Sequence, residues 1–275
     1  MVSFPNAKIN IGLNIIGKRA DGFHNLETLF YPIAVKDAVE IVENKGASTD
    51  VIFSSTGNSV QVNDADNLCV KAYHLLKIYF PQIPPIKMHL HKNIPMGAGM
   101  GGGSADASTI LLLLNKKFQL NITTEKLLQY ALQLGSDCPF FIINKPCFAT
   151  GQGENLQQVN IDLSPYKIMI VHPAIHVNTA DAFSQLNPSN FSPAGELHQQ
   201  IKLDISLWKD VVKNDFEVPV FIKHPLLKEI KANLYKQGAI YSAMSGSGST
   251  VFGIFSSQTN CENIQFPSHY FCQIV

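Results

Sequence analysis

Five glycines within seven residues give this chain its clearest chemical signal. They lie in the segment Pro95–Asp106, which reads Pro-Met-Gly-Ala-Gly-Met-Gly-Gly-Gly-Ser-Ala-Asp. Glycine accepts positive φ angles and lets a backbone approach a ligand closely. A helix that starts at Ser104 would direct unpaired N–H groups and the positive end of its dipole at the same loop. The loop therefore predicts an anion site, most simply for phosphate. The alternative is a glycine-rich turn that binds no ligand, which these features favour less.

Several known phosphate-binding patterns compete for this loop. Gly97, Gly99 and Gly102 satisfy the Gly-x-Gly-x-x-Gly spacing of a dinucleotide site. That site also needs an acidic residue about 20 positions further on, whereas residues 116–122 read Lys-Lys-Phe-Gln-Leu-Asn-Ile. No lysine follows the glycines as in a P-loop, and the His-Arg-Asp and Asp-Phe-Gly signatures of protein kinases are missing. A nicotinamide-dependent oxidoreductase is therefore a weak alternative.

The composition limits the partners that we expect. A chain of 275 residues forms one large domain or two moderate ones, and we expect two. Lysine plus arginine and aspartate plus glutamate both number 21, so there is no global charge to hold nucleic acid or an anionic membrane. We therefore expect neither a nucleic-acid nor a membrane partner, and any anion must be bound locally.

Cysteine usage and the N-terminal residues favour a cytoplasmic protein. The five cysteines are odd in number and form no Cys-x-x-Cys pair, which argues against a disulfide framework and a zinc cluster. Residues 1–5 contain no basic segment followed by an apolar run. The longest aliphatic run, Ile110–Leu114, is too short to span a bilayer.

The glycine loop is expected to join a strand to a buried helix. Residues 86–91 read as the strand that enters the loop, and Ser104–Phe118 as the helix that leaves it. Residues 110–114 are apolar all round, which predicts a helix at the centre of its domain. Two further helices are expected over 67–80 and 123–134.

A polar strand face is predicted near the N-terminus. Residues 2–16 alternate in places and are rich in isoleucine and asparagine, and a second strand is expected over 29–42. The polar face of the first strand carries Lys8, Asn10, Gly12 and Asn14. A lysine on a strand is usually a solvated charge. The neighbouring asparagines favour the floor of a polar cleft.

Local pattern alone leaves the roles of several other residues open. Phe23 and His24 follow an Asp-Gly turn, where they could stack on and hydrogen-bond a heterocyclic base, although a packed loop histidine is more common. Asp137 follows a helix stop, where an aspartate ordinarily caps its own backbone. His89 and His91 share a strand face, but no third ligand stands at a fitting offset, so they are interpreted as structural.

The second half of the chain mixes strands and helices, which predicts an α+β layer. Strands are expected over 167–171, 239–243, 250–255 and 270–274, and helices over 179–185, 206–212 and 225–237. Residues 244–249 form a second loop of small residues, suited to a close backbone approach or to a tight hairpin. We place a domain boundary between an N-terminal domain, 1–155, and a C-terminal domain, 156–275.

Taken together, these motifs resemble those of the GHMP kinase superfamily. The loop Pro95–Asp106 is similar to its Pro-x3-Gly-Leu-Gly-Ser-Ser ATP loop. One branch, whose members phosphorylate CDP-methylerythritol in the non-mevalonate isoprenoid pathway, is similar across nearly the whole chain. The segments that carry this likeness are Ala7–Leu13, Arg19–His24, Leu26–Thr28, Gly135–Phe140 and Ser245–Ser249.

The resemblance implies a fold and an activity. The fold is α+β with two domains, a ribosomal-S5-like N-terminal half and a ferredoxin-like C-terminal half, which meet at a cleft. The activity is ATP-dependent phosphorylation of the substrate 2-hydroxyl, with Mg²⁺ neutralising charge. Asp137 resembles the catalytic base of the branch, and Lys8 resembles the lysine that keeps this carboxylate ionised. We expect a monomer or weak homodimer.

The same resemblance implies the ligand contacts. His24 would read the cytidine end, Phe23 and Phe183 would stack on it, and Asn10 would line the substrate pocket. The residues expected to hold ATP are Pro95, Met96, Gly97, Ala98, Gly99, Met100, Gly101, Gly102, Gly103, Ser104 and Ala105.

Two departures from the branch leave questions open. Phe23 stands where the branch commonly has tyrosine, and Ala105 replaces the second serine of the loop. The metal ligands stay unassigned, and Asp106, in the first turn of the expected helix, either caps that helix or binds metal. A GHMP kinase for mevalonate or homoserine and a non-catalytic nucleotide-binding homologue are the remaining alternatives.

Overall fold

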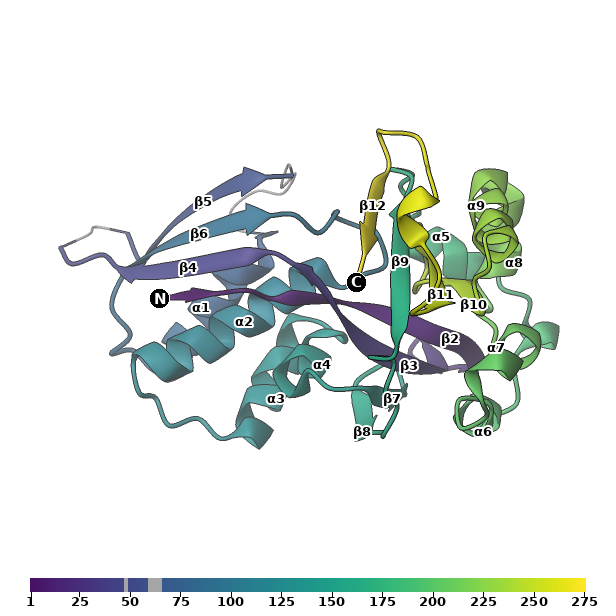
Figure 1. Cartoon of the computed structure of the whole chain (residues 1–275). Coiled ribbons are helices and arrows are strands. Elements are labelled where there is room, and N and C mark those ends of the chain that lie inside the picture. The colour runs from purple at the N-terminus through teal and green to yellow at the C-terminus, as the bar shows by residue number, and fades with distance from the viewer. Residues whose placement is uncertain (47–48, 59–65) are drawn as a thin grey trace. The chain divides into compact units, whose positions relative to one another are not determined.

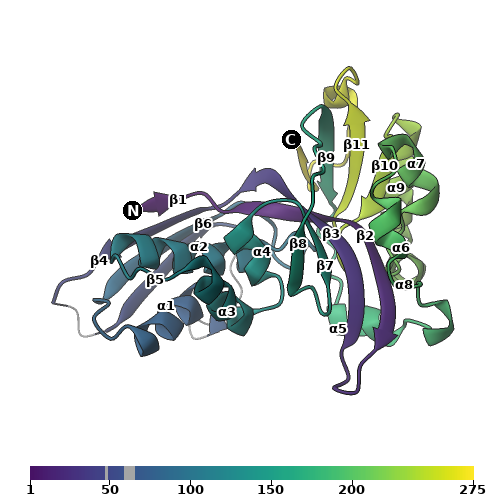
Figure 2. The same cartoon turned by 90° about the horizontal axis from the view of Figure 1, so that it is seen from below.

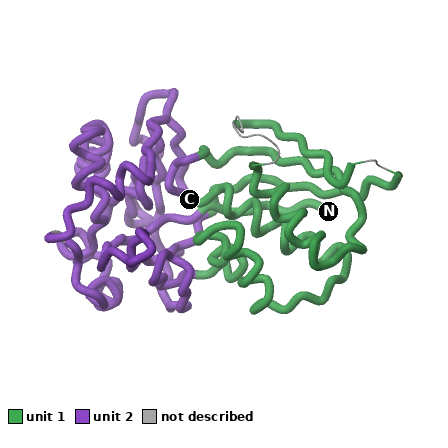
Figure 3. Tube along the Cα trace, turned by 180° about the vertical axis from the view of Figure 1, so that it is seen from behind, with its two compact units in different colours: residues 1–7, 34–96, 101–145 green, residues 8–33, 97–100, 146–275 purple. Residues whose placement is uncertain are grey.

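A computed structural model of the chain describes residues 1–46, 49–58 and 66–275 (Figure 1). These residues form two compact units (Figure 3). The first unit comprises residues 1–7, 34–96 and 101–145, and the second comprises 8–33, 97–100 and 146–275. In the described part of the chain, no helix is both long enough and apolar enough to cross a membrane.

The first unit is a sheet with helices on one face. The sheet has the order β1-β4-β6-β5, and only the β5–β6 pair is parallel. Its strands are β1 (Val2–Ser3), β4 (Ala38–Glu43), β5 (Val51–Gly57) and β6 (Ile86–Lys92). Its helices are α1 (Leu68–Tyr79), α2 (Gly102–Lys117), α3 (Thr124–Leu134) and α4 (Cys138–Ile143). Two views agree that α1 and α2 lie against the sheet (Figure 1, Figure 2).

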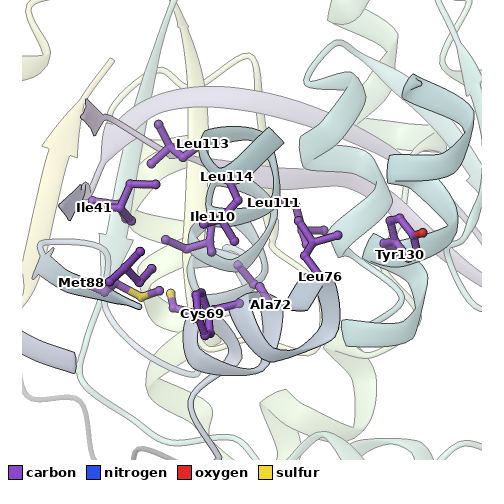
Figure 4. Close-up of a cluster of buried hydrophobic side chains, with 14 of the residues drawn as sticks. Ile41, Cys69, Ala72, Leu76, Met88, Ile110, Leu111, Leu113, Leu114 and Tyr130 are labelled. Atoms are coloured by element: carbon purple, nitrogen blue, oxygen red, sulfur yellow. The ribbon is translucent and has the colours of Figure 1, made fainter. Parts of the chain in front are cut away.

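The core of this unit lies between the sheet and the helices. Figure 4 shows Ile41 and Met88 of the sheet together with Cys69 of α1 and Ile110 of α2, all of which are buried. The expectation that residues 110–114 are buried all round is wrong at one position, because Leu112 is 37% exposed. One face of α2 therefore reaches solvent, and the other faces hold the helix in the core.

The second unit contains two further sheets. One has the order β10-β11-β9-β12, and the other has the order β2-β3-β7-β8. The strands of the first are β9 (Tyr166–His172), β10 (Tyr241–Met244), β11 (Val251–Ser256) and β12 (Phe271–Ile274). Those of the second are β2 (Asn6–Lys18), β3 (His24–Lys36), β7 (Cys147–Thr150) and β8 (Asn155–Gln158). Residues 6–7 of β2 and 34–36 of β3 belong to the first unit.

Helices complete the second unit. They are α5 (Thr179–Ser184), α6 (Glu196–Gln200), α7 (Ile205–Val211), α8 (Glu217–Lys223) and α9 (Pro225–Lys236), with 3-10 turns at Pro188–Asn190 and Cys261–Asn263. Along α9, Leu227, Ile230 and Leu234 recur at helical spacing and are buried in one core cluster with Met169 and Val251 of the sheet. The mixture of sheets and helices confirms the predicted α+β class.

Some predicted boundaries are wrong in detail. The strand expected over 29–42 is divided at Asp37, whose side chain accepts hydrogen bonds from the backbone amides of Asn93 and Ile94. The helix expected from Ser104 begins at Gly102, because Gly101 takes a left-handed conformation and ends the loop.

The two compact units do not coincide with the predicted domains, 1–155 and 156–275. Residues 8–33 group with the C-terminal residues because β3 pairs with β7, and β7 pairs in turn with β8. Compactness is one criterion among several for a domain, so the boundary between 155 and 156 stays a prediction.

Candidate active site

The glycine loop has the conformation that its sequence requires. Gly97, Gly99 and Gly101 have φ angles of 63°, 78° and 69°, a region that side-chain-bearing residues rarely adopt. Gly101 is also the N-cap of α2 and has no side chain with which to cap it. The first amides of this 16-residue helix therefore stay available for an anion.

The second small-residue loop, 245–249, packs against residues 97–100 within the second unit. Ser245 Oγ donates to the carbonyl oxygen of Gly99 at 2.8 Å, and the amide of Thr250 donates to the carbonyl oxygen of Ala98 at 3.1 Å. A Cβ added at Gly99 would lie 2.2 Å from the carbonyl oxygen of Ser245. Both interpretations of this loop hold, since it connects the β10–β11 hairpin and also approaches another backbone closely.

Lys8 is a buried charge beside the glycine loop. Its side chain is 4% exposed, and its Nζ donates to Asn10 Oδ1 at 2.5 Å and to the Gly99 carbonyl oxygen at 3.3 Å. Its backbone amide also donates to the Met100 carbonyl oxygen at 3.0 Å. The interpretation of Lys8 as a solvated strand lysine is therefore wrong. The ammonium lies where it can act on a ligand of the loop.

Asn10 is held through both its backbone amide and its side chain. Its backbone amide donates to Ser245 Oγ at 3.1 Å, and its Nδ2 donates to Thr28 Oγ1 at 2.9 Å. Thr28 Oγ1 donates in turn to the carbonyl oxygen of Gly12 at 2.6 Å. Sequence reasoning gave Thr28 no individual role, although it belongs to the motif Leu26–Thr28. Its hydroxyl fixes the amide orientation of Asn10.

His24 and Phe183, far apart in the sequence, form a stacked pair in the second unit. Their ring centroids are 4.9 Å apart and the rings are inclined by 19°, while Phe191 meets His24 edge-on at 6.0 Å. Partial burial, with a smaller contribution from Lys18, lowers the pKa of His24, so the imidazole is neutral at pH 7. Phe23 does not join this group, since its side chain is 59% exposed at the β2–β3 turn.

Asp137 lies in the first unit at the N-cap of α4. Its side chain makes no capping hydrogen bond to that helix. The following residues fix its backbone, because Cys138 to Phe141 are buried and Ser108 Oγ of α2 donates to the carbonyl oxygen of Cys138 at 2.8 Å. Asp137 therefore stands on a rigid support.

Known proteins match this chain over nearly its whole length. A family model described as "GHMP kinases N terminal domain" matches residues 67–145, and one described as "GHMP kinases C terminal" matches residues 197–266. A protein of Bacteroides fragilis named 4-diphosphocytidyl-2-C-methyl-D-erythritol kinase is 48% identical over 98% of this chain and 97% of its own. The chain belongs to the GHMP kinase family.

Other GHMP kinases agree with this assignment. A protein of Cytophaga hutchinsonii with the same name as the Bacteroides relative is 45% identical, over 96% of this chain and 98% of its own. The crystal structure of a 4-(cytidine 5'-diphospho)-2C-methyl-D-erythritol kinase superposes with a TM-score of 0.77 at 29% identity, covering 92% of this chain and 90% of its own. Mevalonate kinase of Methanococcus jannaschii, at 12% identity and a TM-score of 0.73 over 100% and 96% of the two chains, shares the fold.

The carboxylate of Asp106, near the glycine loop of this GHMP kinase, forms an ion pair. Asp106 is 2% exposed, and its Oδ2 accepts a hydrogen bond from Lys92 Nζ at 2.8 Å. It therefore pairs with a lysine, which sequence reasoning did not consider. A signal was present, because Lys92 continues the alternation of buried residues Ile86, Met88 and Leu90 along β6.

The histidines and cysteines that could bind a metal have other contacts or lie apart in this GHMP kinase. Within residues 1–46, 49–58 and 66–275, no cluster of three His, Cys, Asp or Glu side chains could hold a metal ion. His89 and His91 instead hydrogen-bond β5, with Ser54 Oγ 2.8 Å from Nδ1 of the first and Thr56 Oγ1 3.0 Å from Nδ1 of the second. All five cysteines are free thiols.

Asn214 is a supporting residue that the sequence did not reveal. It is 2% exposed, and its Nδ2 donates to the carbonyl oxygens of Met244 and Gly246 at 2.7 and 2.8 Å. Its Oδ1 accepts from the amide of Phe216 at 3.0 Å. One amide side chain therefore anchors the loop that supports Gly99. Its position directly before Asp215 in a short connection carries no recognisable pattern.

Replacing Asn214 with alanine should lower the free energy of unfolding by about 1–3 kcal/mol, since it leaves buried carbonyl groups without a donor. Urea unfolding followed by circular dichroism would measure the change. Asn233→Ala is the matched control, because this partly exposed asparagine on α9 should change stability by less than about 0.5 kcal/mol. Equal stability of the two variants would contradict the anchoring role.

Proposed function

We propose that this protein is an ATP-dependent kinase that phosphorylates the 2-hydroxyl of 4-diphosphocytidyl-2-C-methyl-D-erythritol. The observation that carries the proposal is the match to relatives with that enzyme's name, at 45–48% identity over 96–98% of this chain. Mevalonate and homoserine kinases share the fold at 12–15% identity. This likeness shows the fold alone, so it does not favour mevalonate or homoserine as the substrate of this protein.

The glycine loop is the proposed holder of the ATP phosphates. Three glycines with positive φ angles allow a ligand to approach the backbone closely, and the uncapped start of α2 supplies amide donors. This arrangement fits a polyphosphate, because each amide can donate to a phosphate oxygen at no cost in side-chain ordering. We include Pro95 to Ala105 in this contact, and the last four of these residues, Gly102 to Ala105, belong to α2.

Asp137 and Lys8 are the proposed catalytic residues. An alcohol is a weak nucleophile until a base accepts its proton, and a carboxylate on a rigid support can do so. The Lys8 ammonium, fixed by Asn10 and the Gly99 carbonyl, would stabilise the negative charge that develops during transfer. Asn10, itself held by Thr28, is the proposed contact to the substrate.

Mg²⁺ is proposed only as the counter-ion of ATP, where it would neutralise phosphate charge. The described side chains do not fit a protein-held ion, since they include no cluster of three suitable ligands and Asp106 is paired with Lys92. We assign no residue to the metal. We also propose that the enzyme acts in the cytoplasm as a monomer or weak homodimer, in keeping with its free cysteines.

An ADP-release assay with a panel of alcohols tests the proposed function. The purified protein with ATP, Mg²⁺ and CDP-methylerythritol should release ADP, whereas mevalonate and homoserine should give at least about 100-fold lower kcat/KM. Preferential turnover of either of these alcohols would identify a different GHMP kinase. ATP binding without turnover of any alcohol would identify a non-catalytic homologue.

His24→Ala should raise the KM for CDP-methylerythritol by about 10-fold to 100-fold and leave the KM for ATP unchanged. The reason is that stacking of a base on a side chain contributes about 1–3 kcal/mol. The His24 ring itself is held in place by its stacking on Phe183. His24→Phe keeps the stacking surface and removes the hydrogen bond to the base. Its KM for CDP-methylerythritol should therefore lie between that of wild type and that of His24→Ala. Steady-state kinetics with each substrate varied in turn measures these effects.

His198→Ala is the matched control for this experiment. His198 also contacts an aromatic ring, Phe148, with centroids 4.6 Å apart, and it is outside the proposed site. An increase in the substrate KM for His198→Ala as large as that for His24→Ala would rule out a specific role for His24. Phe23→Ala tests the remaining stacking candidate, and we expect a smaller effect than for His24, because its ring is mostly exposed.

A further inference from the structure

The glycine loop has two stems, and both belong to the first unit. The entering stem is Lys92–Ile94, at the end of β6, and the leaving stem is Gly102–Asp106, the first five residues of α2. A loop of glycines has no rigidity of its own. Its shape therefore depends on how firmly these two stems are held.

Asp37 holds the entering stem. Its Oδ1 accepts from the backbone amides of Asn93 and Ile94 at 2.6 and 2.8 Å, and its Oδ2 accepts from Lys92 Nζ. One carboxylate thus binds three donors on three successive residues. The last of these residues directly precedes Pro95, where the loop begins.

Lys92 connects the entering stem to the leaving stem. Its Nζ donates to Asp106 Oδ2 at 2.8 Å and to Asp37. A Cβ added at Gly102 would lie 2.8 Å from the same Nζ, so the ammonium lies directly against the first turn of α2. A positive charge at the N-terminus of a helix is repelled by the helix dipole. The two carboxylates offset that repulsion.

We propose that Asp37, Lys92 and Asp106 form an ionic clamp that joins the two stems of the glycine loop and thereby sets its affinity for the phosphates of ATP. The three side chains are at most 2% exposed, so solvent does not screen their charges. They are positioning residues, since none is placed in contact with the nucleotide. The clamp rests on the proposed use of ATP at this loop.

The clamp changes its charge near neutral pH. Burial raises the pKa of Asp106 to about 7, against the opposing effect of the Lys92 charge, and Asp37 raises it further. Burial lowers the pKa of Lys92, but Asp106 and Asp37 outweigh this effect and leave it raised, so Lys92 stays protonated. The Cys69 thiol of α1 also faces the cluster, and burial raises its pKa, so it stays neutral. Above pH 7 Asp106 is ionised, and its charge then holds the ammonium most firmly.

The decisive experiment measures ATP binding at two pH values. Titration calorimetry with ATP and excess MgCl2, without any alcohol substrate, gives the Kd of the wild type and of Asp106→Asn at pH 6 and pH 8. Asparagine resembles the protonated aspartate in shape and charge. We therefore expect the variant to bind ATP about tenfold more weakly than wild type at pH 8 and within about twofold of it at pH 6. Protonation of ATP itself affects both proteins equally.

Asn115→Ala is the matched control at the other end of α2. The Asn115 side chain bonds the amide and carbonyl of Ile122 at 3.0 Å, so its loss weakens the fold without contact to either stem. Its Kd should equal that of wild type at both pH values. Lys92→Met is less useful, because two buried carboxylates without a cation would disrupt folding.

Each outcome decides the proposal. If the ratio of the Kd for ATP of Asp106→Asn to that of wild type is the same at pH 6 and pH 8, the clamp is overturned and the pair is merely structural. Equal ATP affinity of the two proteins at pH 8 would overturn it as well. A wild type that binds no ATP would refute the clamp together with ATP use, whereas failure to phosphorylate the proposed alcohol leaves this measurement unaffected.

Discussion

Replacing Asp137 with asparagine should lower kcat by about 10²-fold to 10⁴-fold and leave ATP binding intact. This is the range that a positioned general base contributes, and asparagine preserves the shape of the side chain while removing its ability to accept a proton. Because Cys138 to Phe141 pack in the core and hold the backbone at this position, the substitution should not alter the fold. Single-turnover kinetics with saturating CDP-methylerythritol would measure the loss directly.

Asp204→Asn serves as the control for this loss of charge. Asp204 also stands at a helix N-cap, that of α7, where its side chain accepts from the amide of Ser206. Asparagine caps helices equally well, so activity and stability should be unchanged. A decrease in kcat of less than about tenfold for Asp137→Asn would show that this residue does not act as the base.

Replacing Gly99 with alanine should weaken ATP binding by at least about 100-fold, a loss typical of a misplacement of about 1 Å in a binding site. The added Cβ would lie 2.2 Å from the Ser245 carbonyl oxygen and 3.0 Å from that of Gly248, and both obstacles are backbone atoms. The φ angle of 78° would also strain any other residue. The loop must therefore move away from residues 245–249, and the Lys8 hydrogen bond to the Gly99 carbonyl moves with it.

Gly238→Ala separates backbone strain from the steric clash. Gly238 has a φ angle of 94°, and no atom lies within 4 Å of an added Cβ. Alanine there should lower the free energy of unfolding by about 1–2 kcal/mol and leave the Kd for ATP unchanged. If Gly99→Ala binds ATP as tightly as Gly238→Ala in calorimetry, close contact with residues 245–249 has no bearing on the nucleotide site.

The sequence predicted the glycine loop well because its conformation depends on local chemistry. Only glycine adopts the required φ angles readily, and an aliphatic run marks the helix that follows. The same holds for α1, where Asn67 caps the first turn and accepts from the amide of Cys69. Such features need no knowledge of distant residues.

The elements that were not anticipated depend on distant residues. The β5 strand is largely exposed and its second half, 54–57, has no large apolar side chain, so only its parallel pairing with β6 makes it a strand. The α4 helix has six residues, too few to show a helical period, and packing against α2 stabilises it. The pairing of Asp106 with Lys92 could not be inferred from spacing, because Lys92 ends β6, Asp37 lies between β3 and β4, and the three residues meet only in the folded unit.

The division of the site residues between two units also follows from long-range pairing. His24 lies on β3, which pairs with β7 after residue 146, and Lys8 lies on β2, the neighbour of β3 in the same sheet. Asp137 belongs to the first unit. The resemblance to GHMP kinases supplied their roles, and the fold and family are confirmed. The roles of the individual residues stay predictions until the variants above are measured.

Neither compact unit is a continuous stretch of the chain, since each is assembled from three separate segments. No single truncation can therefore isolate one unit, and no single exchange of adjoining gene sequence can transfer one to another protein. The phosphate loop itself divides between residues 100 and 101, so its first glycines are inherited with one unit and its last with the other. A chimera that exchanges one unit for that of a relative must therefore join the two parent sequences within this loop.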